Sequence, residues 1–174
     1  MVRRKDVRLG RRGWATICNV ARVILICGLP GSGKTALARA LARERRGVRL
    51  CPDEWLTVLE IDLYDEHARD LIETLQCRLA EELLQLGQSV VIEWGLWGRS
   101  ERDALRHRCR ELGVGVELRF LDVPVETLWQ RVAARNADQP WGAAPIAQDD
   151  LLKWAEEFEA PDAEELAQFD GPEP

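Results

Sequence analysis

Apolar runs alternate with amphipathic, helix-like segments along most of the chain. The run Val23–Cys27 contains no polar residue and has the length of a buried strand. Strands that alternate with helices favour an α/β fold, in which helices cover a parallel sheet. The pattern predicts strands over Val23–Cys27, Val48–Cys51, Val90–Ile92 and Val116–Leu121, and helices over 34–46, 66–86, 99–112, 125–136 and 147–158. The predicted apolar face of the helix over 66–86 consists of Ala68, Leu71, Ile72, Leu75, Leu79, Leu83 and Leu86.

One domain accounts for this pattern. A chain of 174 residues, 46% of them hydrophobic and 31% charged, has the size and composition of a single folded domain. We expect that domain to span residues 22–160. A fifth strand is poorly marked, and Ala167–Asp170 is its one late candidate. No apolar run approaches the roughly 20 residues that a membrane helix requires, so we expect no membrane contact.

The charge is concentrated at the two ends of the chain. The net charge is −6. Residues 1–21 carry six basic residues and one aspartate, whereas residues 149–174 carry ten acids and one lysine. We interpret residues 1–21 as a basic extension and residues 161–174 as an acidic tail, both solvated. The near-neutral body between them is not typical of a strong nucleic-acid binder.

The cysteines indicate neither a disulfide framework nor a zinc site. The chain has 5 cysteines, no Cys-x-x-Cys pair and only 2 histidines. The arginines near the N-terminus are not followed by an apolar segment of the kind found in secretory signals. Reduced thiols and a cytoplasmic location are the simplest expectation.

A glycine-rich motif follows the first predicted strand. Residues 28–35 read Gly-Leu-Pro-Gly-Ser-Gly-Lys-Thr and match the phosphate-binding loop pattern in full. Between a strand and a helix, such a loop points backbone N–H groups and a helix N-terminus at a phosphate. Lys34 is one of only three lysines, and its compact ammonium suits the outer phosphates. We expect the Thr35 hydroxyl to bind Mg²⁺. The expected phosphate-binding residues are Gly28, Pro30, Gly31, Ser32, Gly33, Lys34 and Thr35.

Nucleoside triphosphate binding leaves switch GTPases, mechanical ATPases and small kinases as candidates. The Asn-Lys-x-Asp motif that reads guanine is absent, which favours ATP over GTP. A ring-forming ATPase needs a helical lid domain for which 174 residues leave no room. A kinase needs only a base for the acceptor hydroxyl, an acid that organises Mg²⁺, and cations over the transferred phosphoryl group.

Two acidic residues follow predicted strands. Asp53 comes just after the second strand, at the edge where side chains face the crevice of an open α/β sheet. It either accepts the proton of an attacking hydroxyl or caps a helix that begins at Glu54. Glu93 ends the third strand, where it either holds the water shell of Mg²⁺ or faces solvent as a strand-end acid.

Four arginines are candidates to neutralise charge on the phosphoryl oxygens. Arg131 and Arg135 are four residues apart, hence on one face of a predicted helix. We expect this helix to belong to a lid region over about 125–147. Arg99 and Arg102 follow the third strand. The alternative for each is a solvated side chain, because the chain holds 21 arginines.

Together these motifs resemble the small P-loop kinases, the AAA-like group that contains the zeta toxins, chloramphenicol phosphotransferase and the 5′-hydroxyl polynucleotide kinases. The resemblance covers about residues 22–136. It implies a three-layer P-loop NTPase fold whose parallel sheet has about five strands in the order 2-3-1-4-5. It also implies ATP and Mg²⁺ as ligands, with Asp53 as general base and Arg131 or Arg135 as the lid arginine. The segments that carry it are the loop, Pro52-Asp53-Glu54-Trp55, Glu93 with Arg99-x-x-Arg102, and Leu128-x-x-Arg131-x-x-x-Arg135-Asn136.

The sequence leaves the acceptor open. Trp55, Trp94 and Trp97 lie near the predicted sheet edge, where they either stack on a flat acceptor or fill the packing between helices and sheet. Without a basic groove in the body, a small-molecule hydroxyl, such as that of an antibiotic, a nucleotide or a nucleotide sugar, ranks above a polynucleotide or RNA end. A third hypothesis is an ATP-binding regulatory module without transfer activity.

Overall fold

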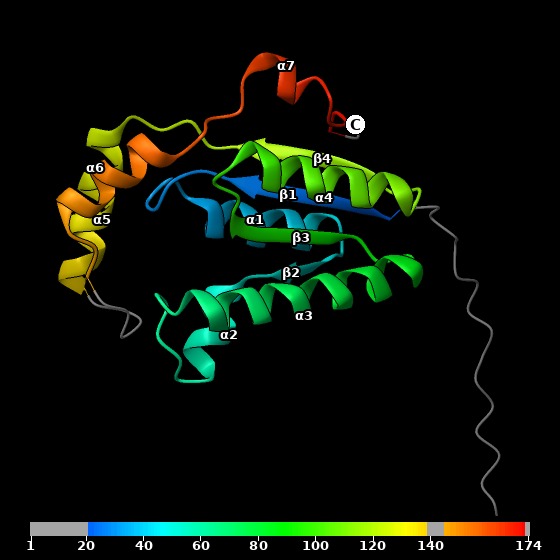
Figure 1. Ribbon diagram of the computed structural model, residues 1–174, viewed down its shortest axis with the longest axis horizontal. Coiled ribbons are helices and arrows are strands. Elements are labelled where there is room, and N and C mark those ends of the chain that lie inside the picture. Colours follow the sequence, from blue (N-terminus) through cyan, green and yellow to red (C-terminus); the bar gives the residue numbers. More distant parts are fainter. Residues whose placement is uncertain (1–20, 139–144, 173–174) are drawn as a thin grey trace, which may run out of the picture.

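The computed structural model describes residues 21–138 and 145–172 and consists of a parallel sheet with helices on both faces (Figure 1). The sheet contains β1 (Arg22–Cys27), β2 (Val48–Leu50), β3 (Val90–Gly95) and β4 (Gly115–Phe120), in the order β2-β3-β1-β4. The helices are α1 (Lys34–Glu44), α2 (Pro52–Val58), α3 (Glu66–Gln85), α4 (Arg99–Glu111), α5 (Val125–Asp138), α6 (Gln148–Glu157) and α7 (Ala163–Leu166). The predicted α/β class and the order of the first four strands are confirmed.

The core has two layers because successive side chains of a strand point to opposite faces. On β1, Val23 and Leu25 belong to the cluster that includes residues of α3 and α4. Ile24 and Ile26 belong to the cluster formed with α1. Helices α5 and α6 lie together beyond the carboxyl ends of the strands (Figure 1). Among the described residues, no helix combines the length and the hydrophobicity that crossing a bilayer requires.

Two helices were not predicted in full. Helix α2 has Pro52 at its start and only 7 residues, too few for a clear helical period. Helix α7 has 4 residues and begins after Asp162, whose side chain accepts a hydrogen bond from the backbone N–H of Glu165 at 2.7 Å. Both helices are too short for their hydrophobic pattern to predict them.

The buried face of α3 differs from the predicted one. Ile72, Gln76, Ala80 and Leu84 are its buried residues, whereas Leu71 and Leu75 are about half exposed. The prediction of an apolar stripe through Leu71, Leu75 and Leu86 is therefore wrong. The face of α3 that packs in the interior is a different one, and it includes Gln76.

The described residues form four strands, so the predicted fifth strand at Ala167–Asp170 is wrong. This segment makes one ladder-like contact with β4: the backbone N–H of Asp170 donates to the carbonyl of Val116 at 2.8 Å, and its carboxylate accepts from the N–H of Val116 at 2.7 Å. Phe169 is buried in the core. Pairing does not continue, because Gly171 and Pro172 follow and proline lacks an N–H.

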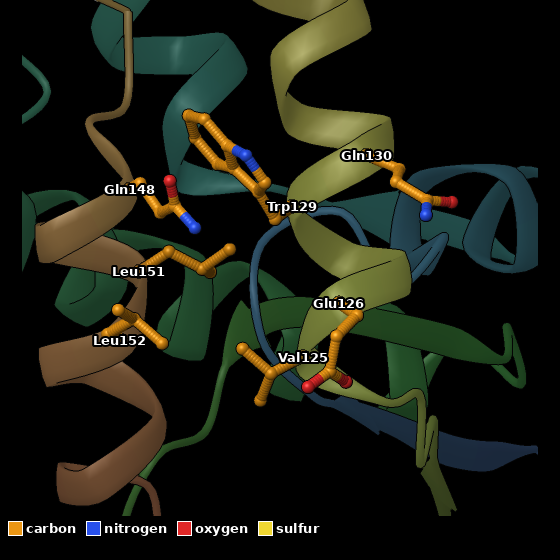
Figure 2. Close-up of a pocket in the computed structure, with 7 residues that line it drawn as sticks. All are labelled: Val125, Glu126, Trp129, Gln130, Gln148, Leu151 and Leu152. Atoms are coloured by element: carbon orange, nitrogen blue, oxygen red, sulfur yellow. The ribbon is translucent and has the colours of Figure 1, made fainter.

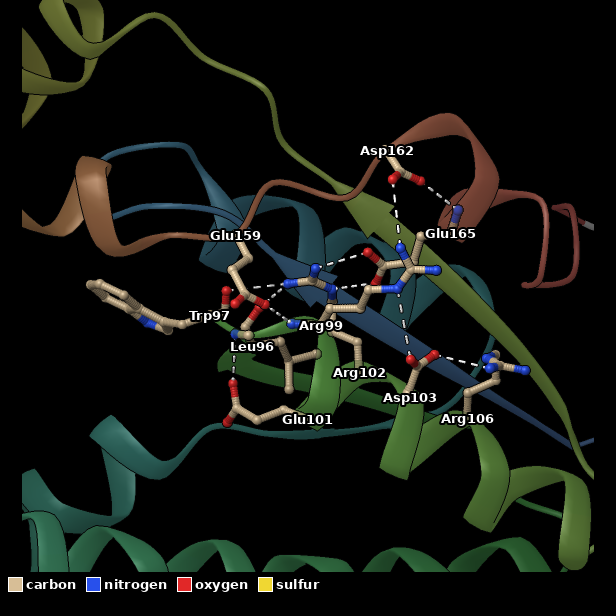
Figure 3. Close-up of polar contacts among 11 residues, drawn as sticks. Leu96, Trp97, Arg99, Glu101, Arg102, Asp103, Arg106, Glu159, Asp162 and Glu165 are labelled. Carbon is tan, nitrogen blue, oxygen red and sulfur yellow. Dashed lines mark hydrogen bonds and ion pairs between the residues drawn. The ribbon is translucent and has the colours of Figure 1, made fainter.

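The acidic segment from residue 161 to 172 packs on the domain, which differs from the expected solvated tail. Figure 3 shows Arg102 of α4 and Glu165 of α7 facing each other, and both side chains are almost completely buried. The Arg102 Nε and Nη2 groups donate to the two carboxylate oxygens of Glu165 at 2.6 and 2.9 Å. Arg110 also pairs with Asp170. The positive charges that neutralise this segment therefore come from arginines of the domain, which lie far from it in the sequence.

We expect Glu165→Gln to lower the free energy of unfolding by about 3 kcal/mol, because it leaves the guanidinium of Arg102 buried without a counter-charge. Chemical denaturation of the full chain measures this change. The exposed neighbour Glu164 supplies the matched control, and Glu164→Gln should change stability by less than about 0.5 kcal/mol. Equal stability of the two variants would contradict the structural role of the pair.

Candidate active site

The glycine-rich motif forms a tight loop between β1 and α1. Gly31 has a φ of 83° and Gly33, which precedes α1, has a φ of 101°. Both angles lie in the region that glycine adopts most readily. A Cβ atom at Gly31 would also come within 2.9 Å of the carbonyl oxygen of Leu128 on α5. Glycine is therefore required here both for the turn and for the close approach of α5.

The side chains of Lys34 and Ser32 are the polar groups that a bound anion would contact inside this loop. The Nζ group of Lys34 donates to the carbonyls of Gly28 and Leu29 at 2.8 and 3.0 Å. Burial lowers the pKa of Lys34, an effect opposed by the nearby charges of Glu93 and Asp53. The Ser32 hydroxyl is buried and has no partner among the described residues. A buried polar group without a partner is costly, and a phosphate oxygen would satisfy this one.

Glu93 connects the loop to the sheet. Its Oε1 accepts a hydrogen bond from the Thr35 hydroxyl, and its Oε2 accepts one from Arg49 of β2, both at 2.5 Å. Glu93 is only 7% exposed, so the interpretation as a solvent-facing strand-end acid is wrong. The hydroxyl and carboxylate oxygens that meet here are the hard ligands that Mg²⁺ prefers. Because both carboxylate oxygens already have partners, this set suits a Mg²⁺ that Thr35 binds directly and Glu93 contacts through water.

Asp53 lies in the first turn of α2 with a side chain that is 60% exposed. Its Oδ1 accepts a hydrogen bond from Arg69 of α3 at 2.7 Å. The N-cap of α2 is Cys51, so the alternative in which Asp53 caps a helix is wrong. The carboxylate is close enough to Lys34 for its charge to act on the pKa of that lysine. Asp53 is thus accessible, paired with an arginine and near the loop.

Arg131 lies on the loop, whereas Arg135 does not. The Nη1 group of Arg131 donates to the carbonyls of Gly31 and Ser32 at 3.1 and 3.4 Å. Arg135, one turn further along α5, is exposed and forms no ion pair within the described residues. Of the predicted lid region over 125–147, residues 139–144 lie outside the described residues. The described part packs against the loop through Leu128 and Val132.

Arg99 and Arg102 have structural partners. Arg102 donates to Glu165 and, through Nη1, to the carbonyl of Leu96 at 3.0 Å (Figure 3). Arg99 pairs with Asp103 and Asp162. These contacts fasten the loop after β3 to the C-terminal segment. Arg102 is therefore committed to the protein interior and is not available to a phosphate.

The three tryptophans near the sheet edge are held by packing contacts. The indole N–H of Trp94 donates to Oε1 of Gln76 at 2.8 Å. Trp97 makes an edge-to-face contact with Trp154, with ring centroids 5.9 Å apart. Trp55 packs partly buried against the core. Of the two interpretations of these residues, the packing one describes their contacts.

The hollow between α5 and α6 is lined by side chains of these two helices and by none of the phosphate-binding loop (Figure 2). On α5, the residues that line it alternate with Leu128, Arg131 and Val132, which face the loop. By helical geometry the two sets occupy different faces of α5. The hollow is therefore not the position of a nucleotide whose phosphates bind the loop. Its lining consists of Val125, Glu126, Trp129, Gln130, Gln148, Leu151 and Leu152.

A family model described as an AAA domain (AAA_33) matches residues 23–161. The chain belongs to this AAA-domain family. The match spans the sheet, the loop and every candidate residue named above, and the resemblance to small P-loop kinases is confirmed at this level. No curated protein shows significant similarity to the sequence.

Solved structures share the fold of this AAA domain. A candidate kinase from Chloroflexus aurantiacus is 20% identical with a TM-score of 0.68, and the match covers 82% of each chain. A gluconokinase from Sinorhizobium meliloti is 22% identical with a TM-score of 0.58, over 83% of this chain and 79% of that one. Kti12 from Chaetomium thermophilum, in complex with ADP-AlF3, is 18% identical with a TM-score of 0.62, over 80% and 81%. At these identities the likeness establishes the fold alone.

Four polar residues of the AAA domain were not found from the sequence. Arg49 donates a hydrogen bond to Glu93, and Arg69 donates one to Asp53. Glu73 and Gln76 follow Arg69 on α3 and lie on the same helix face. Arg49 stands in the middle of the predicted strand Val48–Cys51, and this charge within a strand was the available signal. The residues on α3 gave no such signal, because the predicted apolar stripe lay on another face.

Proposed function

We propose that this AAA domain is a Mg·ATP-dependent kinase that transfers the γ-phosphate to a hydroxyl group of a small molecule. The observation that carries the proposal is the meeting of three elements at one end of the sheet. Lys34 lies inside the loop, Thr35 bonds Glu93, and Asp53 stands accessible beside Arg69. These supply a cation for the phosphates, oxygens for Mg²⁺ and, in Asp53, a carboxylate that accepts a proton.

The transfer step assigns one role to each residue. Asp53 accepts a hydrogen bond from the acceptor hydroxyl and takes its proton as the oxygen attacks the γ-phosphorus. A bond forms between that oxygen and phosphorus while the bond to the β–γ bridging oxygen breaks, and its electron pair leaves with ADP. The proton on Asp53 then returns to water. Lys34 and Arg131 stabilise negative charge on the phosphoryl oxygens.

Mg²⁺, when bound, would neutralise charge on the β- and γ-phosphate oxygens. The residues that would hold it are Thr35, through its hydroxyl, and Glu93, through a coordinated water. Arg49 keeps the carboxylate of Glu93 in position. The proposal therefore assigns the metal to the boundary between the loop and β3.

Transfer of label from γ-³²P-ATP into a small-molecule cell extract tests the proposal. We expect the full chain to label at least one compound, and Lys34→Ala to label none above the level without protein. A gluconokinase and a chain of an RNA repair complex that includes Pnkp1 share this fold, so gluconate and a 5′-hydroxyl RNA oligonucleotide are included as defined acceptors. The match covers 44% of that RNA repair chain. Absence of any label would favour the regulatory module, whereas label in the oligonucleotide alone would favour the RNA-end kinase.

A further inference from the structure

A polar stripe on α3 lies beside the proposed base. Arg69, Glu73 and Gln76 are spaced by four and three residues and therefore share one helix face. Arg69 reaches Asp53 on α2 at 2.7 Å, and Gln76 accepts a hydrogen bond from Trp94 at the end of β3. The stripe thus runs from the proposed base towards the end of the sheet. Neither the phosphate-binding loop nor the Mg²⁺ residues use it.

Gln76, a member of this stripe, has a hydrogen-bond donor that lacks an acceptor in the described part of the chain. The residue is 0% exposed, yet its Nε2 group has no partner among the described residues. Its Oε1 is occupied by the indole N–H of Trp94. A buried amide donor without an acceptor is costly, so such a group indicates an oxygen that arrives with a ligand.

Negative charge predominates around Glu73. Its side chain is 20% exposed and lies 3.7 Å from Arg69. The acids Asp70 on α3, Asp53 on α2 and Glu101 on α4 also act on it. Burial and these acids raise the pKa of Glu73 to about 7. Arg69 is the one cation that faces Glu73 within the described residues, and it already donates to Asp53 and to the carbonyl of Leu63.

This distribution of charge selects among acceptors. A phosphate or carboxylate brought to this surface meets several carboxylates and one arginine that is already paired with Asp53 and Glu73, so its approach is repulsive. A hydroxyl or ammonium group instead donates hydrogen bonds to these carboxylates, and those to an ionised acceptor are the stronger kind. The stripe therefore favours donor-rich ligands without negative charge.

We infer that the stripe Arg69–Glu73–Gln76 binds the phosphoryl acceptor, and that the acceptor is a neutral or cationic polyhydroxyl compound. The inference rests on the proposed kinase function and narrows it. It disfavours nucleotides, nucleotide sugars and polynucleotide ends, all of which bring phosphates to this surface. Glu73 is the residue that determines this preference.

An extract separated by charge tests the acceptor class. Ion-exchange resins divide the small molecules into cationic, neutral and anionic pools, and each pool is offered to the full chain with γ-³²P-ATP. We expect the highest rate of labelling in the cationic or neutral pool. A higher rate in the anionic pool would overturn the inference while supporting the kinase. No label above Lys34→Ala in any pool would overturn the kinase and the inference together.

Replacing Glu73 tests the residue itself. With the most active pool as acceptor at pH 8, we expect Glu73→Gln to raise the apparent KM about tenfold with little change in kcat, because a charge-assisted hydrogen bond becomes a neutral one. As the pH rises through 7, the wild-type KM should fall because Glu73 ionises, whereas the KM of the variant should stay level. Glu82 is exposed on the same helix, and Glu82→Gln is the matched control. Equal KM values for Glu73→Gln and wild type, with the variant folded by circular dichroism, would overturn the role of Glu73.

Discussion

Replacing Asp53 by Asn should slow phosphoryl transfer about a thousandfold, because general-base catalysis typically contributes 10²- to 10⁴-fold. The asparagine keeps the size of the side chain and still accepts the hydrogen bond from Arg69, but it does not take a proton at neutral pH. ATP affinity should change by less than about twofold, because Asp53 lies on α2 and makes no hydrogen bond with the loop. Rapid-quench measurement of labelled product gives the rate, and calorimetry gives the dissociation constant of ATP.

Glu60 provides the control for that substitution. It is an exposed acid in the turn after α2, so Glu60→Gln removes the same charge nearby without touching Arg69. Its transfer rate should match that of the wild type. Unchanged turnover by Asp53→Asn would remove Asp53 from the role of base. Loss of ATP binding would instead mean that α2 supports the loop.

The parts of the fold that could be predicted are those governed by local pattern. After Arg22, β1 is an uninterrupted apolar run, and the glycines that follow it adopt positive φ, so strand, loop and helix follow from neighbouring residues alone. The position of Asp53 follows from the same logic, since residues just after parallel strands gather at one edge of the sheet. Local sequence therefore sufficed for the phosphate-binding loop and for the side of the sheet on which chemistry was expected.

The parts that could not be predicted depend on contacts between distant segments. Arg102 was a candidate for phosphate because it follows β3, but its partner is Glu165, which lies 63 residues later. The two charges looked solvated separately and are buried together. The same holds for Glu73: its burial against neighbouring elements raises its pKa, and acids on α2 and α4, which its own helix does not reveal, add to the effect. Pairing of this kind appears only once the helices are packed.

The two arginines of α5 differ in their contacts with the phosphate-binding loop. Arg131 and Arg135 were equivalent by spacing, because both lie on one face of the helix. Only Arg131 reaches the carbonyls of the loop, and the approach of α5 to Gly31 leaves no room for a Cβ atom there. The guanidinium of Arg131 already contacts the loop at which the phosphates of ATP are proposed to bind.

We therefore expect Arg131→Ala to lower kcat about a thousandfold, because an arginine that neutralises the transferred phosphoryl group contributes 10³- to 10⁵-fold in related chemistry. The dissociation constant of ADP should change little, since the charge that Arg131 stabilises develops on the transferred group. Single-turnover rates with saturating ATP measure the effect. Arg43, exposed in the last turn of α1, is the charge-matched control, and Arg43→Ala should transfer phosphate at the wild-type rate. Arg135→Ala separates the two lid candidates. If Arg135→Ala loses phosphoryl transfer while Arg131→Ala keeps it, then Arg135 supplies the charge, and the contact of Arg131 with the loop carbonyls serves only to pack α5.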